Sequence, residues 1–421
     1  MITERFIVLP YTKETRRTTR FIERFIFASC FVVCVIFLYN DRYIHDLLTK
    51  NERLYKMYRR REERHNDSST PRQAGFLENL DQNESRSRTS NQPSQCRPRN
   101  NIVFLKTHRT GSSTITNIIN RYGDSRNLTF VLPKKGKYRL RWPYLFNTAA
   151  YAPLQGRTPN ILCNHARYNR EELDRLMPKD VAHVTIIRDP ADQFSSVFEK
   201  FKLGEILGIN SMDSLSEFLS NPWFYLEKAL ENENIQAVEF HRLQLARNGM
   251  MFDLGFDPLD YDNTDRIRRY IERLDKEFNL VMLTEYFTES LVLLKYLMCW
   301  DFNDVLHFAL NARTHSNQKT PLTEYLKSRI REWNQADFLL YKHFNESFWT
   351  KVNTYGEGFF NDVTILGNKI KLWENACRAM EDRTKFDSKE IGNLESTLEM
   401  CRKLIKNETS YIEYFQHRQN I

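Results

Sequence analysis

The segment KTHRTGSST at positions 106–114 gathers residue types that bind phosphate groups. An apolar run at 102–105 precedes it, and isoleucines follow it at helical spacing. In such a strand–turn–helix unit, the amides of the turn and of the first helical turn point to one place and carry partial positive charge. The pattern therefore predicts a phosphate-binding cradle, to which Lys106, His108 and Arg109 add side-chain donors.

This loop differs from a Walker A loop. The Walker A pattern needs a first glycine and a lysine directly before the serine or threonine, and the segment has neither. An ordinary strand-to-helix turn with a good cap is the alternative to a phosphate site. In either case the helix after the loop is expected to end at Gly123.

A second strand and helix carry a matching set of polar residues. The apolar segment 181–187 indicates another buried strand, and Arg188 follows it directly. Apolar spacing after Pro190 indicates a helix whose second turn contains Ser196. Because open α/β sheets bind ligands at the carboxyl edge of their strands, the two units could hold the two ends of one doubly phosphorylated nucleotide. A structural ion pair is the alternative role for Arg188.

These units predict the fold class. Two buried strands, each followed by a helix, indicate an α/β domain with a central parallel sheet flanked by helices. We place this domain at residues 99–421. Its last part, 350–421, is rich in Glu, Lys and Leu and indicates helices without evident chemistry. That part could cover the sheet, form a homodimer or shape a binding site.

Composition and charge exclude some classes of protein. The 421 residues are 41% hydrophobic, which is enough for a large core and excludes a disordered chain. Of the formal net charge of +8, residues 1–100 carry almost all, with 19 Lys and Arg against 12 Asp and Glu. The rest of the chain is close to neutral, which disfavours a general electrostatic grip on nucleic acid.

The N-terminal segment has the pattern of a membrane anchor. Residues 25–39 form an uncharged apolar run, and the basic segment 1–24 before it is expected to be a cytoplasmic tail. The run is short, so a cleaved signal peptide is the alternative, but no small-residue cleavage pattern follows it. Residues 40–98 predict a stem. We expect a type II membrane protein with a luminal domain, whose short span suits early secretory membranes.

Cysteines and glycosylation motifs agree with that topology. Five of the seven cysteines follow the anchor, and this odd number leaves at least one without a partner in the chain. None has the spacing of a zinc site, which argues against a metal. Five Asn-x-Ser/Thr motifs are potential glycan acceptors. They begin at Asn66, Asn83, Asn127, Asn345 and Asn407.

Several of these segments together resemble the galactose 3-O-sulfotransferases, a family that includes the galactosylceramide sulfotransferases. FLKTHRTGSST at 104–114 is similar to the 5′-phosphosulfate loop of the family, and RDPADQFSSVFEKF at 188–201 is similar to its 3′-phosphate segment. The segment ILCNHARYN at 161–169 and the long stretch 283–313 also match. The short loops are moderately specific, whereas the long stretch contains no general nucleotide-binding motif.

The resemblance implies a P-loop-like sulfotransferase fold and the donor 3′-phosphoadenosine 5′-phosphosulfate (PAPS). It also implies transfer of a sulfonate group to the 3-hydroxyl of a terminal β-galactose, by a Golgi enzyme that needs no metal. The acceptor would be a galactose-terminated glycolipid or glycoprotein glycan, and nucleic acid would not be a partner.

Site residues follow from the resemblance together with the chemistry. In-line transfer at sulfur needs a base for the acceptor hydroxyl and a cation for the oxygen of the leaving nucleotide. Lys106 is the expected cation and His108 the first candidate for the base. His165 is the second candidate, with orientation of the galactose as its other role. The expected donor-binding residues are Lys106, Arg109, Thr110, Gly111, Ser112, Ser113, Thr114, Arg188 and Ser196.

Two further features each have more than one possible role. Arg109 stands where family members commonly carry lysine, so we assign it to donor binding and leave its catalytic share open. Arg141, Trp142 and Tyr144 form a basic aromatic patch, which would suit either stacking on a sugar or packing in the core.

Three other functions stay open on the sequence alone. A sulfotransferase for another sugar position or for a glycosaminoglycan would share the donor site. An inactive, sulfotransferase-like glycan-binding protein would share the fold. A nucleotide-dependent phosphotransferase would share the phosphate cradle, although the missing Walker A residues and the expected luminal topology count against it.

Overall fold

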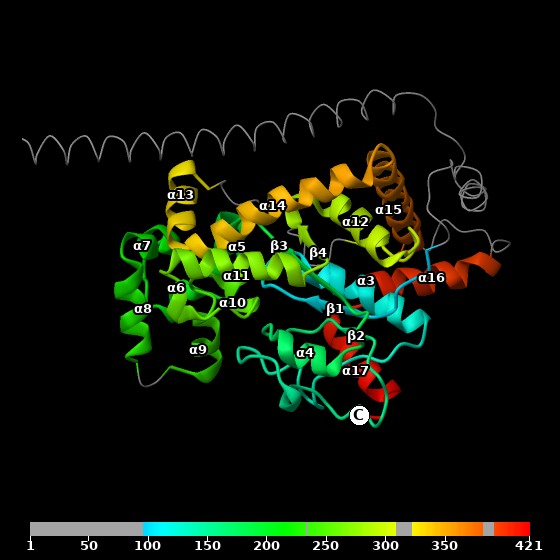
Figure 1. Ribbon diagram of the computed structural model, residues 1–421, viewed down its shortest axis with the longest axis horizontal. Helices are drawn as coiled ribbons and strands as arrows, with labels where there is room; N and C mark the ends of the chain where they lie inside the picture. The colour runs from blue at the N-terminus through cyan, green and yellow to red at the C-terminus, as the bar shows by residue number, and fades with distance from the viewer. Residues whose placement is uncertain (1–95, 233–234, 309–321, 382–390) are drawn as a thin grey trace, which may run out of the picture. The chain divides into compact units, whose positions relative to one another are not determined.

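A computed structural model describes residues 96–232, 235–308, 322–381 and 391–421 (Figure 1). These residues belong to one compact unit, Gln95–Ile421. The expected cytoplasmic tail, membrane anchor and most of the stem lie outside the described residues and stay predictions. Among the residues that are described, no helix combines the length and apolar character needed to cross a membrane.

Four parallel strands form the centre of the domain. Their order across the sheet is β2 (Ile161–Leu162), β1 (Ile102–Leu105), β3 (Ala182–Ile187) and β4 (Leu280–Leu283). Every strand residue is buried, as expected for strands covered on both faces. The predicted α/β architecture with a central parallel sheet is therefore confirmed. The strand expected at 181–187 begins one residue later.

Helices follow the strands in the chain. Strand β1 leads to α3 (Ser112–Ser125), β2 to α4 (Arg170–Leu176), β3 to α5 (Pro190–Lys200) and β4 to α12 (Phe287–Met298). The strand order places β4 and β2 at opposite edges of the sheet, and in Figure 1 α12 lies near β4 and α4 near β2. Because parallel strands all end at one edge, residues that follow them meet there although they are distant in sequence.

Helices also form most of the remaining described chain. Helices α12 and α14 pack on β4, and α15 packs on α12. Three short 3₁₀ helices, η1 to η3, lie in the connecting segments. The bounds of these elements are α6 (Leu203–Ile206), α7 (Ser214–Ser220), α8 (Pro222–Leu230), α9 (Ala237–Leu243), α10 (Gly249–Asp253), α11 (Thr264–Glu277), α13 (Glu324–Trp333), α14 (Gln335–Tyr355), α15 (Phe359–Glu381), α16 (Ile391–Ile405), α17 (Glu408–Arg418), η1 (Thr148–Ala150), η2 (Pro258–Asp260) and η3 (Thr284–Tyr286).

Helix α3 continues past Gly123 to Ser125, so the helix end expected at this glycine is wrong. Gly123 is buried, and a Cβ atom at this position would lie 2.4 Å from the ring of Phe130 and 2.5 Å from the side chain of Ile161. The absence of a side chain therefore permits close packing of α3 against β2, and the glycine does not end the helix.

The C-terminal helices cover the β2 end of the sheet. Helices α16 and α17 lie against α3, where Asn117 donates to two carbonyl groups of the segment 403–406 at 2.9 and 3.0 Å. Gln419 makes two hydrogen bonds with the backbone of Phe130, at 2.7 and 3.0 Å. Of the roles left open for 350–421, covering the sheet is the one that these contacts support.

Two disulfide bonds connect distant parts of the domain. Cys96 pairs with Cys299 at the end of α12, and Cys377 on α15 pairs with Cys401 on α16. Cys163 is buried and free. The five cysteines after the expected anchor thus form two pairs and leave one thiol, as their odd number requires.

Replacement Gly123→Ala tests whether close packing selects this glycine. In an open helical position the change to alanine stabilises a protein by about 0.5–1 kcal/mol, whereas overpacking a core costs about 1–3 kcal/mol. At 123 the new methyl group meets two buried side chains, so we expect the free energy of unfolding to fall by about 1–2 kcal/mol in chemical denaturation. Gly367→Ala on α15 is the matched control, because its Cβ would meet nothing within 4 Å. A gain of stability at both positions would contradict the packing argument.

Candidate active site

Four chain segments meet at the carboxyl edge of the sheet. The 106–114 loop follows β1, the segment 163–165 follows β2, Arg188 follows β3 and η3 follows β4. The first three contain most of the residues that the sequence singled out, and Ser196 lies on α5 just beyond Arg188. The parallel sheet therefore brings these residues into one region, as the position of each after its strand predicted.

Hydrogen bonds from two other segments hold the 106–114 loop. The hydroxyl of Thr284 in η3 donates to the carbonyl of Thr110 at 2.7 Å and lies 3.0 Å from the carbonyl of Ile187. The buried side chain of Gln193 on α5 donates to the carbonyl of His108 at 2.9 Å. The loop is thus attached to the ends of β3 and β4, which explains its fixed position relative to Arg188.

The backbone of the loop is shaped for an anion. Arg109 and Gly111 have left-handed conformations, with φ of 64° and 78°. A Cβ atom at Gly111 would lie 3.2 Å from the ring of Phe287. Gly111 is also the N-cap of α3 and provides no side-chain cap. The amides of the first helical turn therefore have no side-chain acceptor at the N-cap, and such amides bind anions well.

Two hydroxyl groups of the loop make hydrogen bonds within the loop. Thr110 and Ser112 both donate to the carbonyl of Thr107, at 3.0 and 2.8 Å. The hydroxyl of Thr107 in turn contacts the carbonyl of Ile186 on β3. Since a hydroxyl has one hydrogen to donate, these two hydroxyls have no hydrogen left for an anion, and the groups at Thr110 and Ser112 that could bind one are the backbone amides.

Lys106 is fully buried and forms an ion pair with Glu408, the first residue of α17. Asn164 donates to the other carboxylate oxygen at 3.4 Å. A buried ammonium needs such a counter-charge, because leaving water is costly for a charged group. Sequence reasoning missed Glu408, since no local pattern separates it from the other glutamates of the C-terminal helices.

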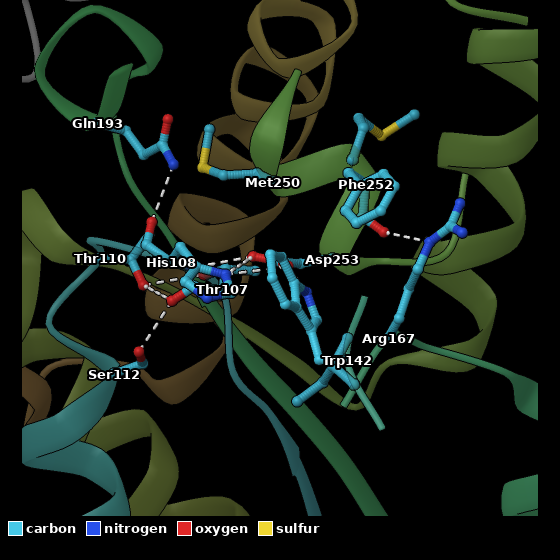
Figure 2. A network of polar contacts seen from close by, with 12 residues as sticks. Thr107, His108, Thr110, Ser112, Trp142, Arg167, Gln193, Met250, Phe252 and Asp253 are labelled. Carbon is cyan, nitrogen blue, oxygen red and sulfur yellow. Dashed lines mark hydrogen bonds and ion pairs between the residues drawn. The ribbon is translucent and has the colours of Figure 1, made fainter. Parts of the chain in front are cut away.

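His108 is oriented by Asp253, a buried carboxylate at the end of α10 (Figure 2). The backbone amide of His108 donates to Asp253 at 2.8 Å, and ring atom Nδ1 lies 2.8 and 3.0 Å from the two carboxylate oxygens. The indole N–H of Trp142 donates to the same carboxylate at 2.8 Å. Sequence reasoning missed Asp253, whose one available signal is an acidic residue inside the apolar segment 249–256.

This contact decides which ring nitrogen of His108 carries the proton. An ionised carboxylate only accepts hydrogen bonds, so Nδ1 must donate, and in the neutral ring Nε2 carries the lone pair. Nε2 is buried and has no hydrogen-bond partner within the described part of the chain. The Asp253–His108 pair therefore presents an imidazole nitrogen that can accept a proton, as general-base catalysis requires.

His165 lies directly against His108. The two ring centroids are 4.3 Å apart and the ring planes differ by 18°. Burial lowers the pKa of His165 well below its ordinary value, and the nearby His108 and Lys106 act in the same direction. His165 is therefore a neutral imidazole at neutral pH. Both predicted histidines belong to one site, where a proton on one ring disfavours a proton on the other.

The predicted aromatic patch is divided in the structure. Trp142 is only 6% exposed, and its ring is tilted against that of His108 with centroids 4.7 Å apart. Tyr144 is 57% exposed, and the guanidinium of Arg141 lies over its ring at 5.5 Å. Trp142 is thus part of the core that supports His108, and of the two aromatic residues only Tyr144 is exposed enough to stack on a sugar.

The residues expected to bind a second phosphate lie together. Nε of Arg109 donates to the buried hydroxyl of Ser196 at 2.9 Å, and Nη1 of Arg188 lies 3.4 Å from the carbonyl of Arg109. The side chain of Arg109 therefore reaches α5. Within the described ranges, no group of three or more His, Cys, Asp and Glu side chains is arranged to hold a metal ion.

A second buried carboxylate supports Asp253. Asp337 on α14 accepts the amides of Met250 and Met251 at 3.1 and 2.7 Å, at the start of the helix that ends in Asp253. Burial raises the pKa of Asp337 to about 7, and the charge of Asp253 acts in the same direction. Asp337 therefore changes its protonation near neutral pH.

Asp337 makes stability depend on pH in a predictable direction. The folded chain keeps this proton up to about pH 7, whereas the ordinary aspartate pKa is 3.8. The neutral carboxyl therefore contributes its full stability below the ordinary pKa of 3.8. This contribution is lost as the pH rises through the pKa of the folded chain, about 7. We expect the free energy of unfolding to fall between about pH 5 and about pH 8, and to fall less in Asp337→Asn.

Urea denaturation at both pH values measures this difference. Asp265→Asn, which removes an exposed carboxylate on α11, is the control and should retain the wild-type dependence. Equal pH dependence in the wild type and in Asp337→Asn would show that Asp337 is ionised throughout this range.

Comparison with known proteins identifies the family. The profile described as galactose-3-O-sulfotransferase matches residues 69–384. Galactosylceramide sulfotransferase of Homo sapiens is 34% identical over 354 residues, which cover 77% of this chain and 80% of that protein. Galactose-3-O-sulfotransferase 3 of Mus musculus is 32% identical over 345 residues, which cover 76% of this chain and 78% of that protein. Galactose-3-O-sulfotransferase 2 of Mus musculus is 36% identical over 261 residues, which cover 61% of this chain and 64% of that protein. The resemblance drawn from the loops is confirmed, and the chain belongs to the galactose-3-O-sulfotransferase family.

Proposed function

We propose that this sulfotransferase moves a sulfonate group from PAPS to the 3-hydroxyl of a terminal β-galactose on a glycolipid or a glycoprotein glycan. Membership of the family supports the reaction and the position on the sugar. The observation that carries the proposal is an anion-binding loop next to an oriented imidazole at one edge of the sheet. The loop alone would fit many nucleotide-binding proteins, whereas a neighbouring base fits group transfer to a hydroxyl.

The donor site has two ends. The backbone amides at the start of α3 and the ammonium of Lys106 suit the phosphosulfate group, which supplies the sulfonate that is transferred. Arg188 and Ser196 suit the 3′-phosphate, and Arg109 joins them because its side chain reaches Ser196. A planar guanidinium binds phosphate oxygens in pairs, which favours an arginine at this end.

In the proposed mechanism, Nε2 of His108 accepts the proton of the galactose 3-hydroxyl while the sugar oxygen forms a bond to sulfur. The bond from sulfur to the bridging oxygen breaks, and its electron pair goes to the departing nucleotide. Lys106 stabilises the negative charge on that oxygen. Asp253 offsets the positive charge that forms on the imidazole.

His165 has two proposed roles. It is the second candidate for the base, because its lowered pKa keeps the ring neutral and able to accept a proton. Its alternative role is to orient the galactose beside His108. The short distance between the two rings makes these roles separable by kinetics, since a base acts on kcat and an orienting residue acts on the acceptor KM.

The protein is proposed to lie in the Golgi membrane as a single-pass type II protein with a luminal catalytic domain. The apolar run at 25–39 and its basic flank support the anchor and its orientation. Two disulfide bonds support an oxidising compartment. The acceptor class stays at the level of a galactoside, because some relatives are named for galactosylceramide and others only for galactose.

Sulfonate transfer from labelled PAPS to a panel of terminal galactosides tests the function. Removal of a general base typically costs about 10²–10⁴-fold in rate. We therefore expect His108→Ala to lower kcat within this range while the KM for PAPS changes little, and His165→Ala mainly to raise the acceptor KM. His417→Ala, an exposed histidine on α17, is the control and should behave as the wild type.

The outcomes separate the two assignments. A folded His108→Ala enzyme with more than about a tenth of the wild-type kcat, below the loss expected for a general base, would transfer the role of base to His165. Activity retained in both variants would refute the mechanism, and no transfer to any galactoside by the wild type would refute the function.

The three glycosylation motifs within the described residues differ in how exposed their asparagine side chains are. Asn127 and Asn407 are exposed, whereas Asn345 lies in α14 and is 5% exposed. We expect Asn127→Gln and Asn407→Gln each to remove one endoglycosidase-sensitive mobility shift from protein made in the secretory pathway. Asn345→Gln should leave the pattern unchanged, because a glycan cannot be accommodated at a buried side chain. A glycan found at Asn345, or none on either exposed site, would contradict this expectation.

A further inference from the structure

The ion pair between Lys106 and Glu408 has no role in the mechanism described so far. Lys106 is fully buried, and the Glu408 side chain is 21% exposed. The pair joins the loop after β1 to the last helix of the chain, 302 positions away. Glu408 also lies beyond the matched segment of the family, which ends at residue 384.

Helix α17 holds Glu408 in a fixed place. The side chain of Asn407 caps the helix by accepting the amide of Ser410 at 2.8 Å. Near the other end, the ring of Phe415 stacks on that of Phe130 with centroids 4.0 Å apart, and Gln416 donates to a backbone carbonyl at 2.9 Å. With the backbone attached in this way, only the side chain of Glu408 can move when its partner is taken by another group.

The carboxylate and an incoming anion compete for the same ammonium. Lys106 follows β1 directly and begins the loop whose amides are proposed to bind the phosphosulfate, and it is the cation expected at the donor's 5′ end. A phosphosulfate that binds the ammonium of Lys106 also comes close to the carboxylate of Glu408, because the carboxylate contacts the same ammonium. Two negative groups that share one ammonium repel each other strongly in a partly buried site. Binding of the donor therefore requires Glu408 to give up its contact with Lys106.

We propose that Glu408 is a tethered counter-ion of the donor site, which neutralises Lys106 between turnovers and is displaced by the 5′-phosphate end of the nucleotide. This inference rests on the proposed function. It assigns Glu408 two effects: the carboxylate keeps the buried ammonium in position, and it lowers the affinity of the site for the nucleotide. The second effect favours release of adenosine 3′,5′-bisphosphate after the sulfonate has left.

The proposal predicts which part of the nucleotide senses Glu408. Adenosine 3′,5′-bisphosphate carries the 5′-phosphate that would displace the carboxylate, and adenosine 3′-monophosphate lacks it. Removing the charge of Glu408 should therefore strengthen binding of the bisphosphate and leave that of the 3′-monophosphate unchanged. Glutamine keeps the size of the side chain and removes its charge, and one of the two acceptor oxygens becomes an NH₂ donor.

Calorimetry on the full chain in detergent micelles tests the proposal with these two nucleotides. We expect Glu408→Gln to lower the Kd for adenosine 3′,5′-bisphosphate about tenfold, since loss of a like charge at contact distance is worth at least this much. Glu413→Gln, an exposed carboxylate on the same helix, should match the wild type. Glu408→Asp keeps the charge and should stay within about twofold of the wild type.

Two further variants and a test of folding complete the experiment. Thermal unfolding without nucleotide shows whether each variant is folded. Glu408→Ala is the second variant that removes the charge of Glu408. Arg188→Ala, which removes a cation from the other end of the site, should weaken binding of both nucleotides and shows that a loss of affinity is detectable.

The outcomes distinguish the inference from the function on which it rests. Unchanged or weaker binding of the bisphosphate by folded Glu408→Gln and Glu408→Ala overturns the inference, while the donor assignment stands. The inference is also overturned if Glu408→Gln gains as much affinity for the 3′-monophosphate as for the bisphosphate, or if Glu408→Asp gains tenfold affinity for the bisphosphate. In either case the effect would not come from charge at the 5′ end. A wild-type chain that binds neither nucleotide overturns the proposed donor and this inference together.

Discussion

A carboxylate without access to solvent governs the geometry of the catalytic region. Burial of an ionised carboxylate costs several kcal/mol unless hydrogen bonds replace its hydration. Asp253 receives such bonds from the amide and ring of His108 and from the indole of Trp142. The 106–114 loop and the segment around Trp142 must therefore dock against α10 in one arrangement. The orientation of His108, on which the proposed chemistry depends, results from satisfying this buried charge.

Charges around this centre are balanced in pairs. Lys106 is opposed by Glu408, and the ring of His108 is opposed by Asp253. Asp337 on α14 contacts the start of α10 and keeps its proton up to about pH 7, because burial disfavours its charged form and the charge of Asp253 acts in the same direction. Below that pH, a neutral Asp337 leaves Asp253 as the charged member of the two carboxyl groups, and Asp253 contacts His108.

Local patterns were enough to predict the parts of the fold that depend on neighbours in sequence. Apolar runs located two strands, and the rule that parallel strands end at one edge predicted that the 106–114 loop and Arg188 would meet. Asp253 and Glu408 could not be found in this way, because they lie 145 and 302 positions from their partners and only tertiary packing brings them together. Gly123 was misinterpreted, since a glycine at a helix end and one at a tight helix–strand contact look alike in sequence.

The two stacked histidines differ in the charged groups that surround each ring. A proton on Nε2 of His108 makes the ring positive, and the carboxylate of Asp253 at 2.8 Å offsets that charge. The charged groups that act on His165 within the described chain, which include His108 and Lys106, all disfavour a positive ring. His108 therefore has a carboxylate beside its ring that can balance the charge of an accepted proton. This difference supports the proposal that His108 is the base, and the neutral ring of His165, which keeps a lone pair for a hydrogen bond, suits its proposed role of holding the sugar.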